Sequence, residues 1–124
     1  MLKLMIVDDS NIIRRKIERS ADAARFDVVG SARNGSEAVD MLRRTEPQVV
    51  TMDLTMPELD GVAAISELVA INPEVLILVV SALADKATAI EALKRGAHGF
   101  ICKPFTEKEL SDALKEMIHE GQEV

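Results

Sequence analysis

Short apolar runs alternate five times with stretches of helical periodicity along this chain of 124 residues. The apolar runs lie near residues 3–7, 27–32, 48–52, 75–80 and 99–102, and the helical stretches near 11–24, 36–45, 62–71, 84–95 and 107–119. Strands that alternate with helices form right-handed crossovers and a parallel sheet. Runs of Val, Ile, Leu and Met without alternation are typical of strands that helices cover on both faces. The sequence therefore predicts a three-layer α/β sandwich, with residues 1–124 forming one domain.

Local signals mark where three of the predicted helices begin or end. Thr106 and Glu109 have the spacing of a capping box at the start of the last helix. Gly96 is placed to end the fourth helix in a left-handed conformation. Pro73 ends the third helix, because proline disfavours helical geometry at the preceding residue, Asn72. These signals separate the helices from the apolar runs that follow or precede them.

Composition and charge exclude several classes of protein. No stretch approaches the roughly 18 apolar residues of a membrane span, and the first apolar run is too short for a signal peptide. The formal net charge of -6 argues against sequence-independent binding of nucleic acid, which uses Lys and Arg to neutralise phosphates. The one cysteine excludes an internal disulfide and fits a reducing compartment. We expect a cytoplasmic monomer without nucleic-acid or membrane partners, whose acidic surface docks basic partner surfaces.

Polar residues directly follow four of the apolar runs. Asp8 and Asp9 follow the first run and Asp53 follows the third. Ser81 follows the fourth run, and Lys103 follows the fifth. If the runs are parallel strands, these residues share the sheet edge at the carboxyl ends of the strands, where open α/β sheets bind ligands. Carboxylates, waters and phosphate oxygens are the ligands that Mg²⁺ prefers, so the sequence predicts a site for a divalent cation and a phosphoryl group.

Asp53 has the chemistry of a nucleophile, because a carboxylate can take up a phosphoryl group as an aspartyl-phosphate. The neighbouring acids would repel phosphate unless a metal ion compensated their charge. Lys103 supplies a point charge on a long stem, and Ser81 supplies a hydroxyl that can bond a phosphoryl oxygen. Pro104 fixes the turn after the last strand, and bonds of this X–Pro type are the ones that adopt the cis form. The alternative is that each acid caps a helix or turn and that Ser81 is a turn residue.

Taken together, these residues match a known family. The matching stretches read VDDS at 7–10, MDLTMPELDG at 52–61, SA at 81–82 and GFICKPF at 99–105. In this order and spacing the chain resembles, over essentially its whole length, the receiver domain of two-component response regulators, and most closely the stand-alone chemotaxis regulators. The resemblance implies a flavodoxin-like (βα)5 fold whose five parallel strands have the order 2-1-3-4-5.

The resemblance also implies roles for the acids. Asp53 would accept the phosphoryl group from a sensor histidine kinase of the chemotaxis type. Asp8, Asp9 and the backbone carbonyl of Thr55 would hold Mg²⁺ together with Asp53. We expect no enzymatic activity beyond this self-catalysed phosphoryl acceptance and autodephosphorylation. A phosphatase that uses an aspartyl-phosphate would want a second Asp two residues after the nucleophile, where this chain has Thr55.

Three residues near the ends of the fourth and fifth strands complete the expected switch. Ser81 and Lys103 would contact the phosphoryl group. In the family, the hydroxyl residue then moves inward, and an aromatic residue three positions before the lysine, here Phe100, turns into the vacated space. Because Phe100 has no phenolic hydroxyl, this switch would depend on packing; the alternative is that Phe100 is a static core residue. Cys102 is expected to be a small core residue.

The expected output is binding of a target, without an output domain in the same chain. The resemblance implies a flagellar motor switch protein or another target on the face made by the fourth helix, fifth strand and fifth helix. A phosphatase is a further expected partner. The basic run 14–16 is either a solvated face or part of the contact with the kinase. The alternatives are a phosphorelay intermediate, a phosphate sink, or a receiver cut from a longer regulator, whereas acids in the first strand–helix loop disfavour a flavin-binding protein.

Overall fold

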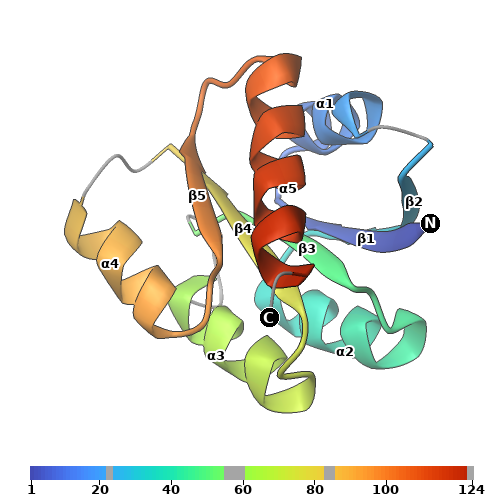
Figure 1. Cartoon of the computed structure of the whole chain (residues 1–124). Coiled ribbons are helices and arrows are strands. Elements are labelled where there is room, and N and C mark those ends of the chain that lie inside the picture. The colour runs from blue at the N-terminus through green and yellow to red at the C-terminus, as the bar shows by residue number, and fades with distance from the viewer. Residues whose placement is uncertain (22–23, 55–60, 83–85, 123–124) are drawn as a thin grey trace.

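The computed structural model describes residues 1–21, 24–54, 61–82 and 86–122. Within these residues, five strands alternate with five helices, as the sequence predicts (Figure 1). The strands are β1 (Leu2–Val7), β2 (Phe26–Ala32), β3 (Val49–Met52), β4 (Leu76–Ser81) and β5 (Gly99–Cys102). The helices are α1 (Asn11–Ser20), α2 (Gly35–Thr45), α3 (Gly61–Ile71), α4 (Lys86–Lys94) and α5 (Glu107–Gln122).

The described strands form one parallel sheet in the order β2-β1-β3-β4-β5. This order confirms the flavodoxin-like fold that the family resemblance implied. Val7 lies opposite Met52, so β1 and β3 end level with one another, whereas β4 continues past Val79, the partner of Met52, to Ser81. The residues that follow β1 and β3 are therefore neighbours at the same edge of the sheet. This edge is where the polar residues of the sequence were expected to meet.

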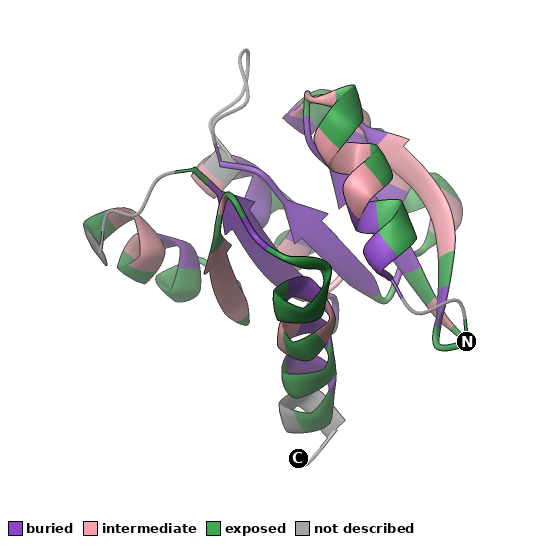
Figure 2. Ribbon diagram, turned by 90° about the horizontal axis from the view of Figure 1, so that it is seen from above, coloured by how far each residue is buried: buried purple, intermediate pink, exposed green. Residues whose placement is uncertain are grey.

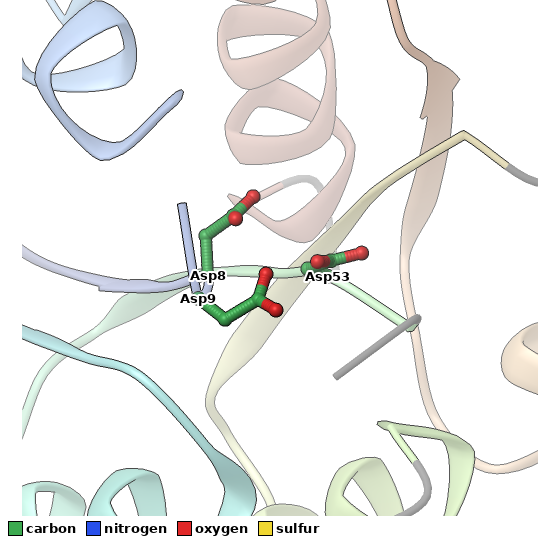
Figure 3. Close-up of side chains that lie close together, drawn as sticks. All are labelled: Asp8, Asp9 and Asp53. Atoms are coloured by element: carbon green, nitrogen blue, oxygen red, sulfur yellow. The ribbon is translucent and has the colours of Figure 1, made fainter. Parts of the chain in front are cut away.

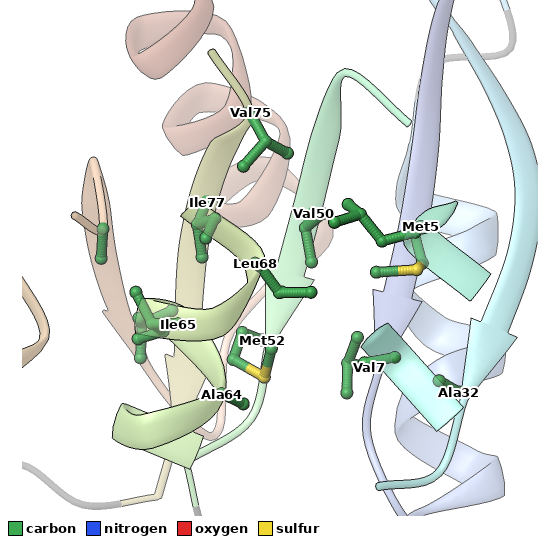
Figure 4. Close-up of a cluster of buried hydrophobic side chains, with 14 of the residues drawn as sticks. Met5, Val7, Ala32, Val50, Met52, Ala64, Ile65, Leu68, Val75 and Ile77 are labelled. Carbon is green, nitrogen blue, oxygen red and sulfur yellow. The ribbon is translucent and has the colours of Figure 1, made fainter. Parts of the chain in front are cut away.

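Helices cover both faces of the sheet, with α1 and α5 on one side and α2, α3 and α4 on the other (Figure 1). Successive side chains of a strand point to opposite faces, so each strand contributes to two buried clusters. Met5 and Val50 belong to the cluster beneath α2, α3 and α4 (Figure 4). Leu4 and Val49 belong to the cluster beneath α1 and α5. The central strands β3 and β4 are buried, whereas β2 and β5 at the edges are partly exposed (Figure 2).

Two of the predicted helix boundaries have the expected hydrogen bonds. The Thr106 backbone N–H donates to Glu109 Oε1 at 3.1 Å, and the Glu109 backbone N–H donates to Thr106 Oγ1 at 3.0 Å, which completes the capping box of α5. Gly96, with φ of +119°, follows α4. The Ala97 N–H donates to the Ala92 carbonyl, and the Gly96 N–H donates to the Leu93 carbonyl, which is the bond pattern of a Schellman C-terminus.

Helix α1 ends four residues earlier than the sequence predicts, at Ser20 instead of residue 24. The Ser20 hydroxyl donates to the Lys16 carbonyl at 2.7 Å, and Ala21 already has an extended backbone. The Leu2 N–H donates to the Arg25 carbonyl at 2.8 Å, so the chain must have left the helix in time to enter β2 beside β1. Helix α5, in contrast, continues past residue 119 to Gln122. No helix in the described part of the chain is long and apolar enough to cross a membrane.

Candidate functional site

Asp8 and Asp53 continue the parallel ladder by one residue beyond the ends of β1 and β3. The Asp8 N–H donates to the Ala32 carbonyl at 3.0 Å, and the Asp53 N–H donates to the Val7 carbonyl at 2.9 Å. Both aspartates are only 1% exposed, whereas Asp9 is exposed. One carboxylate oxygen from each of the three lies within 4.8 Å of the other two, so the three acids form a single cluster (Figure 3).

The start of α1 fixes the orientation of Asp8. Asp8 Oδ1 accepts a hydrogen bond from the Ser10 N–H at 2.9 Å. Ser10 in turn caps α1, since its hydroxyl oxygen accepts from the Ile13 N–H at 3.3 Å. Arg14 donates from Nη1 to the Asp8 carbonyl oxygen at 2.6 Å. The first turns of α1 thus hold both the backbone and the carboxylate of Asp8.

Lys103 joins the two buried carboxylates. Its Nζ donates to Asp8 Oδ2 at 2.8 Å and lies 3.6 Å from Asp53 Oδ2. Its backbone N–H donates to the Ser81 carbonyl at 2.9 Å, which extends the pairing of β4 and β5 past Cys102. The Lys103–Pro104 peptide bond is cis. The fold therefore brings the Lys103 ammonium to the carboxylate of Asp8, 95 positions away in the sequence, as predicted.

Burial raises the pKa of the Asp8 carboxyl above its usual value of 3.8, and the charge of Asp53 raises it further. The hydrogen bond from Lys103, the N–H of Ser10 and the charge of Lys103 act in the opposite direction and lower the pKa. When all groups are ionised, the three carboxylates outnumber the one ammonium, of Lys103, that pairs with two of them, so the cluster carries uncompensated negative charge. A hard divalent cation, which prefers carboxylate oxygens, fits this set of ligands. Among the residues that the structure describes, Asp8, Asp9 and Asp53 could hold it.

The two predicted switch residues occupy different environments. Ser81 is fully buried and is the last residue of β4, paired with Cys102 of β5, rather than the first residue after the strand. Phe100 is partly buried in β5 and packs against the cluster beneath α2, α3 and α4. Its movement on phosphorylation stays a prediction. Thr55, whose carbonyl was predicted as a metal ligand, lies outside the described residues, so that role also stays a prediction.

The prediction that Cys102 is a core residue is wrong, because its side chain is exposed. Strand β5 lies at the edge of the described sheet and pairs with β4 on one side. At the last residue of such a strand the cover of the neighbouring elements ends, so an apolar run no longer implies burial. The apolar run correctly predicted a strand, but it did not by itself indicate that this strand lies at the edge of the sheet.

The basic run 14–16 does not form one solvated face. Arg14 is directed to the Asp8 carbonyl, and Arg15 is exposed. Lys16 donates from Nζ to the carbonyl of Phe105, and its Nζ lies 4.5 Å from the centroid of the Phe105 ring. This last contact joins residues 89 positions apart. No local sequence signal marks this contact, so a role for Lys16 near the site was not predicted.

Comparison with known proteins places the chain in a family. The model of the response regulator receiver domain matches residues 4–115. The chain belongs to the response regulator receiver domain family. The chemotaxis protein CheY of Thermotoga maritima is 41% identical over 115 residues, which cover 93% of this chain and 96% of that protein.

Solved structures agree with this assignment. The response regulator domain of Thermotoga maritima CheB superposes on the receiver domain with a TM-score of 0.85 at 33% identity, covering 100% of this chain and 98% of that one. The CheX–CheY–BeF3–Mg complex of Borrelia burgdorferi gives a TM-score of 0.85 at 25% identity, covering 96% of this chain and 87% of that one. The receiver domain described here is thus CheY-like in sequence and in fold.

Proposed function

We propose that this receiver domain is a phosphorylation-activated signalling switch, in which Asp53 accepts a phosphoryl group from a histidine kinase. The observation that carries the proposal is the cluster of Asp8, Asp9 and Asp53 within 4.8 Å, with the Lys103 ammonium between two of its carboxylates. The Borrelia relative supports it, since that CheY was solved together with beryllofluoride and magnesium. Asp8, Asp9 and Asp53 would hold Mg²⁺ in this chain.

The chemistry asks mainly for positioning and for neutralisation of charge. A carboxylate oxygen of Asp53 attacks the phosphorus, and the bond from phosphorus to the histidine nitrogen of the kinase breaks. Bound Mg²⁺ would neutralise charge on the phosphoryl oxygens and on the acids. Lys103, at 3.6 Å from Asp53, is close enough to form an ion pair with the phosphoryl oxygens. The Ser81 hydroxyl, at the end of the neighbouring β4, would bond another of these oxygens. We propose no catalysis beyond this self-phosphorylation and the later hydrolysis.

The proposed output is a target protein on the face of α4, β5 and α5. Ile90 and Leu93 of α4 are large apolar side chains that are exposed, and exposed apolar groups favour protein contacts. A pocket of about 220 Å³ lies between β5 and α5, with Gly99, Ala113 and Glu116 in its lining. The name of the Thermotoga relative points to chemotaxis, so a flagellar motor switch protein is the target we propose. A phosphatase is a second partner of this proposal.

Amide NMR tests the switch. Beryllofluoride with Mg²⁺, or acetyl phosphate with Mg²⁺, should shift the resonances of residues between Ser81 and Phe105 in the parent protein. Asp53→Asn removes the acceptor and should abolish these shifts. Unchanged resonances in the parent protein at saturating Mg²⁺ and beryllofluoride would refute the proposal. Phosphate transfer from a chemotaxis-type histidine kinase, followed with radiolabelled ATP, tests the donor separately.

A phosphorelay intermediate or phosphate sink is the second candidate. The likeness to the response regulator domain of CheB, at 33% identity, supports this second candidate. It shows that a similar receiver domain also occurs in a protein other than CheY. The two functions differ in where the phosphoryl group or the signal goes next. Binding of a flagellar switch peptide by the beryllofluoride form supports the first function. Rapid transfer of phosphate from Asp53 to a histidine phosphotransferase, without peptide binding, supports the second.

A further inference from the structure

We propose that Lys16 is a positioning residue for phosphoryl transfer, which acts by holding the turn that carries Lys103. The inference rests on the proposed phosphorylation of Asp53 and adds a residue to it. Lys16 lies on α1 and is partly buried. Its ammonium donates to the Phe105 carbonyl and lies 4.5 Å from the centroid of the Phe105 ring. A cation over a ring face and a charged hydrogen bond therefore act on the same residue.

Phe105 is a firm anchor, since it is only 3% exposed and belongs to the cluster beneath α1 and α5. It follows Lys103 by two positions, across the Lys103–Pro104 bond. At the other end of this turn, the Lys103 N–H donates to the Ser81 carbonyl. The turn that carries Lys103 is thus held at both ends, by β4 on one side and by Lys16 and the core on the other.

The acid side of the site depends on the same helix. The first turns of α1 bind Asp8 through the Ser10 N–H and through Arg14. Asp8 and Lys103 form the 2.8 Å ion pair. One helix therefore sets the position of both partners of this ion pair, directly for Asp8 and through Lys16 and Phe105 for Lys103. Without the ammonium of Lys16, Phe105 keeps its place in the buried cluster, but the turn loses the polar contact that joins it to α1.

The ammonium of Lys103 stands at the end of a long flexible stem, so its place depends on the backbone beneath it. Lys103 Nζ lies 3.6 Å from Asp53 Oδ2, so it is close enough to contact an oxygen of a phosphoryl group on Asp53. A displacement of the turn of about 1 Å is enough to slow a reaction that depends on positioning by up to about a hundredfold. Lys16 does not touch the reacting atoms, so its contribution must pass through Lys103.

The first test compares phosphorylation of Asp53 by acetyl phosphate in the parent protein and in variants at position 16. Lys16→Met keeps the length of the stem and removes the charge, and its maximal rate should fall by about tenfold with little change in the KM for acetyl phosphate. Lys16→Arg retains a cation that donates hydrogen bonds and stacks on rings, and it should recover most of the rate. Arg19→Met removes a positive charge from the exposed end of the same helix and should leave the rate unchanged.

The second test is a double-mutant cycle on the affinity for beryllofluoride in saturating Mg²⁺, which needs no chemical step. Lys16→Met should weaken binding in the parent background and have almost no effect in the Lys103→Met background, because coupled residues are not additive. Equal weakening in both backgrounds would show a merely structural role and overturn the proposal, as would a Lys16→Met rate equal to that of the parent. A parent protein that acetyl phosphate fails to phosphorylate would instead refute the proposed function itself.

Discussion

Replacing Thr51 by valine is expected to stabilise the receiver domain. Thr51 lies in β3, between Ile6 of β1 and Leu78 of β4, and is 1% exposed. Its side chain shares a face of the strand with Val49, so it points into the cluster beneath α1 and α5. Its buried hydroxyl oxygen has no hydrogen-bond partner within the described residues. The hydroxyl has therefore lost its hydration without a bond in exchange.

The size of the effect follows from this loss. In proteins, burial of a hydroxyl without a hydrogen bond costs about 1–3 kcal/mol. Valine has nearly the same shape as threonine, so the substitution leaves no cavity and needs no extra space. We expect Thr51→Val to raise the free energy of unfolding by about 1–2 kcal/mol. For a domain of this size, each kcal/mol raises the melting temperature by about 4 °C.

Urea unfolding measures this prediction. The chain has no Trp and no Tyr, so the transition is followed by far-UV circular dichroism. The matched control is Thr45→Val, which removes a hydroxyl that donates to the Met41 carbonyl at 2.8 Å and should give no stabilisation. A lower urea midpoint for Thr51→Val, with an unchanged slope, would refute the reasoning. It would mean that the Thr51 hydroxyl is bonded in solution, for example to a buried water.

Three further predictions concern the acid cluster and the end of α4. In metal-free buffer, Asp8→Asn should stabilise the fold near neutral pH. The pKa of Asp8 is higher in the folded state than in the unfolded state. The stability that protonated Asp8 contributes is therefore fully present below pH 3.8 and is lost as the pH rises through the folded pKa. Urea midpoints against pH should thus fall less in the variant, and an equal or steeper fall would contradict this. Saturating Mg²⁺ should raise the melting temperature of the parent by mass action and should do so less in Asp9→Asn; no rise in the parent would count against the metal site. Gly96→Ala should destabilise by more than about 1 kcal/mol in the same urea assay, because φ is +119° and the new Cβ would lie 2.8 Å from a Val69 methyl; an unchanged midpoint would disprove the strain.

The sequence predicts the sheet well because the apolar runs and the helical periodicity report burial directly. That Asp8 and Asp53 meet required the strand order, and the order came from the family resemblance rather than from the residues. Once β1 and β3 are neighbours, the position of each acid directly after its strand brings the two carboxylates together. This part of the site was therefore predictable.

Contacts between distant segments were not predictable in the same way. The helical pattern predicted a helix through residue 24, yet the bond of Leu2 to Arg25 requires the chain to leave α1 earlier. The roles of Arg14 and Lys16 likewise depend on which groups the folded chain brings beside α1. The end of α1 and the contacts of these side chains depend on tertiary packing, and the periodicity of one segment carries no information about that packing.

The exposure of Cys102 has a practical consequence. It is the one cysteine of the chain, and it stands next to Lys103 at the end of β5. A maleimide dye would therefore label the protein at a single known position without any engineered substitution. A dye at this position would lie next to Lys103, which is expected to contact the phosphoryl group. Its emission would report, in real time and at low protein concentration, when the signalling state forms and when it decays.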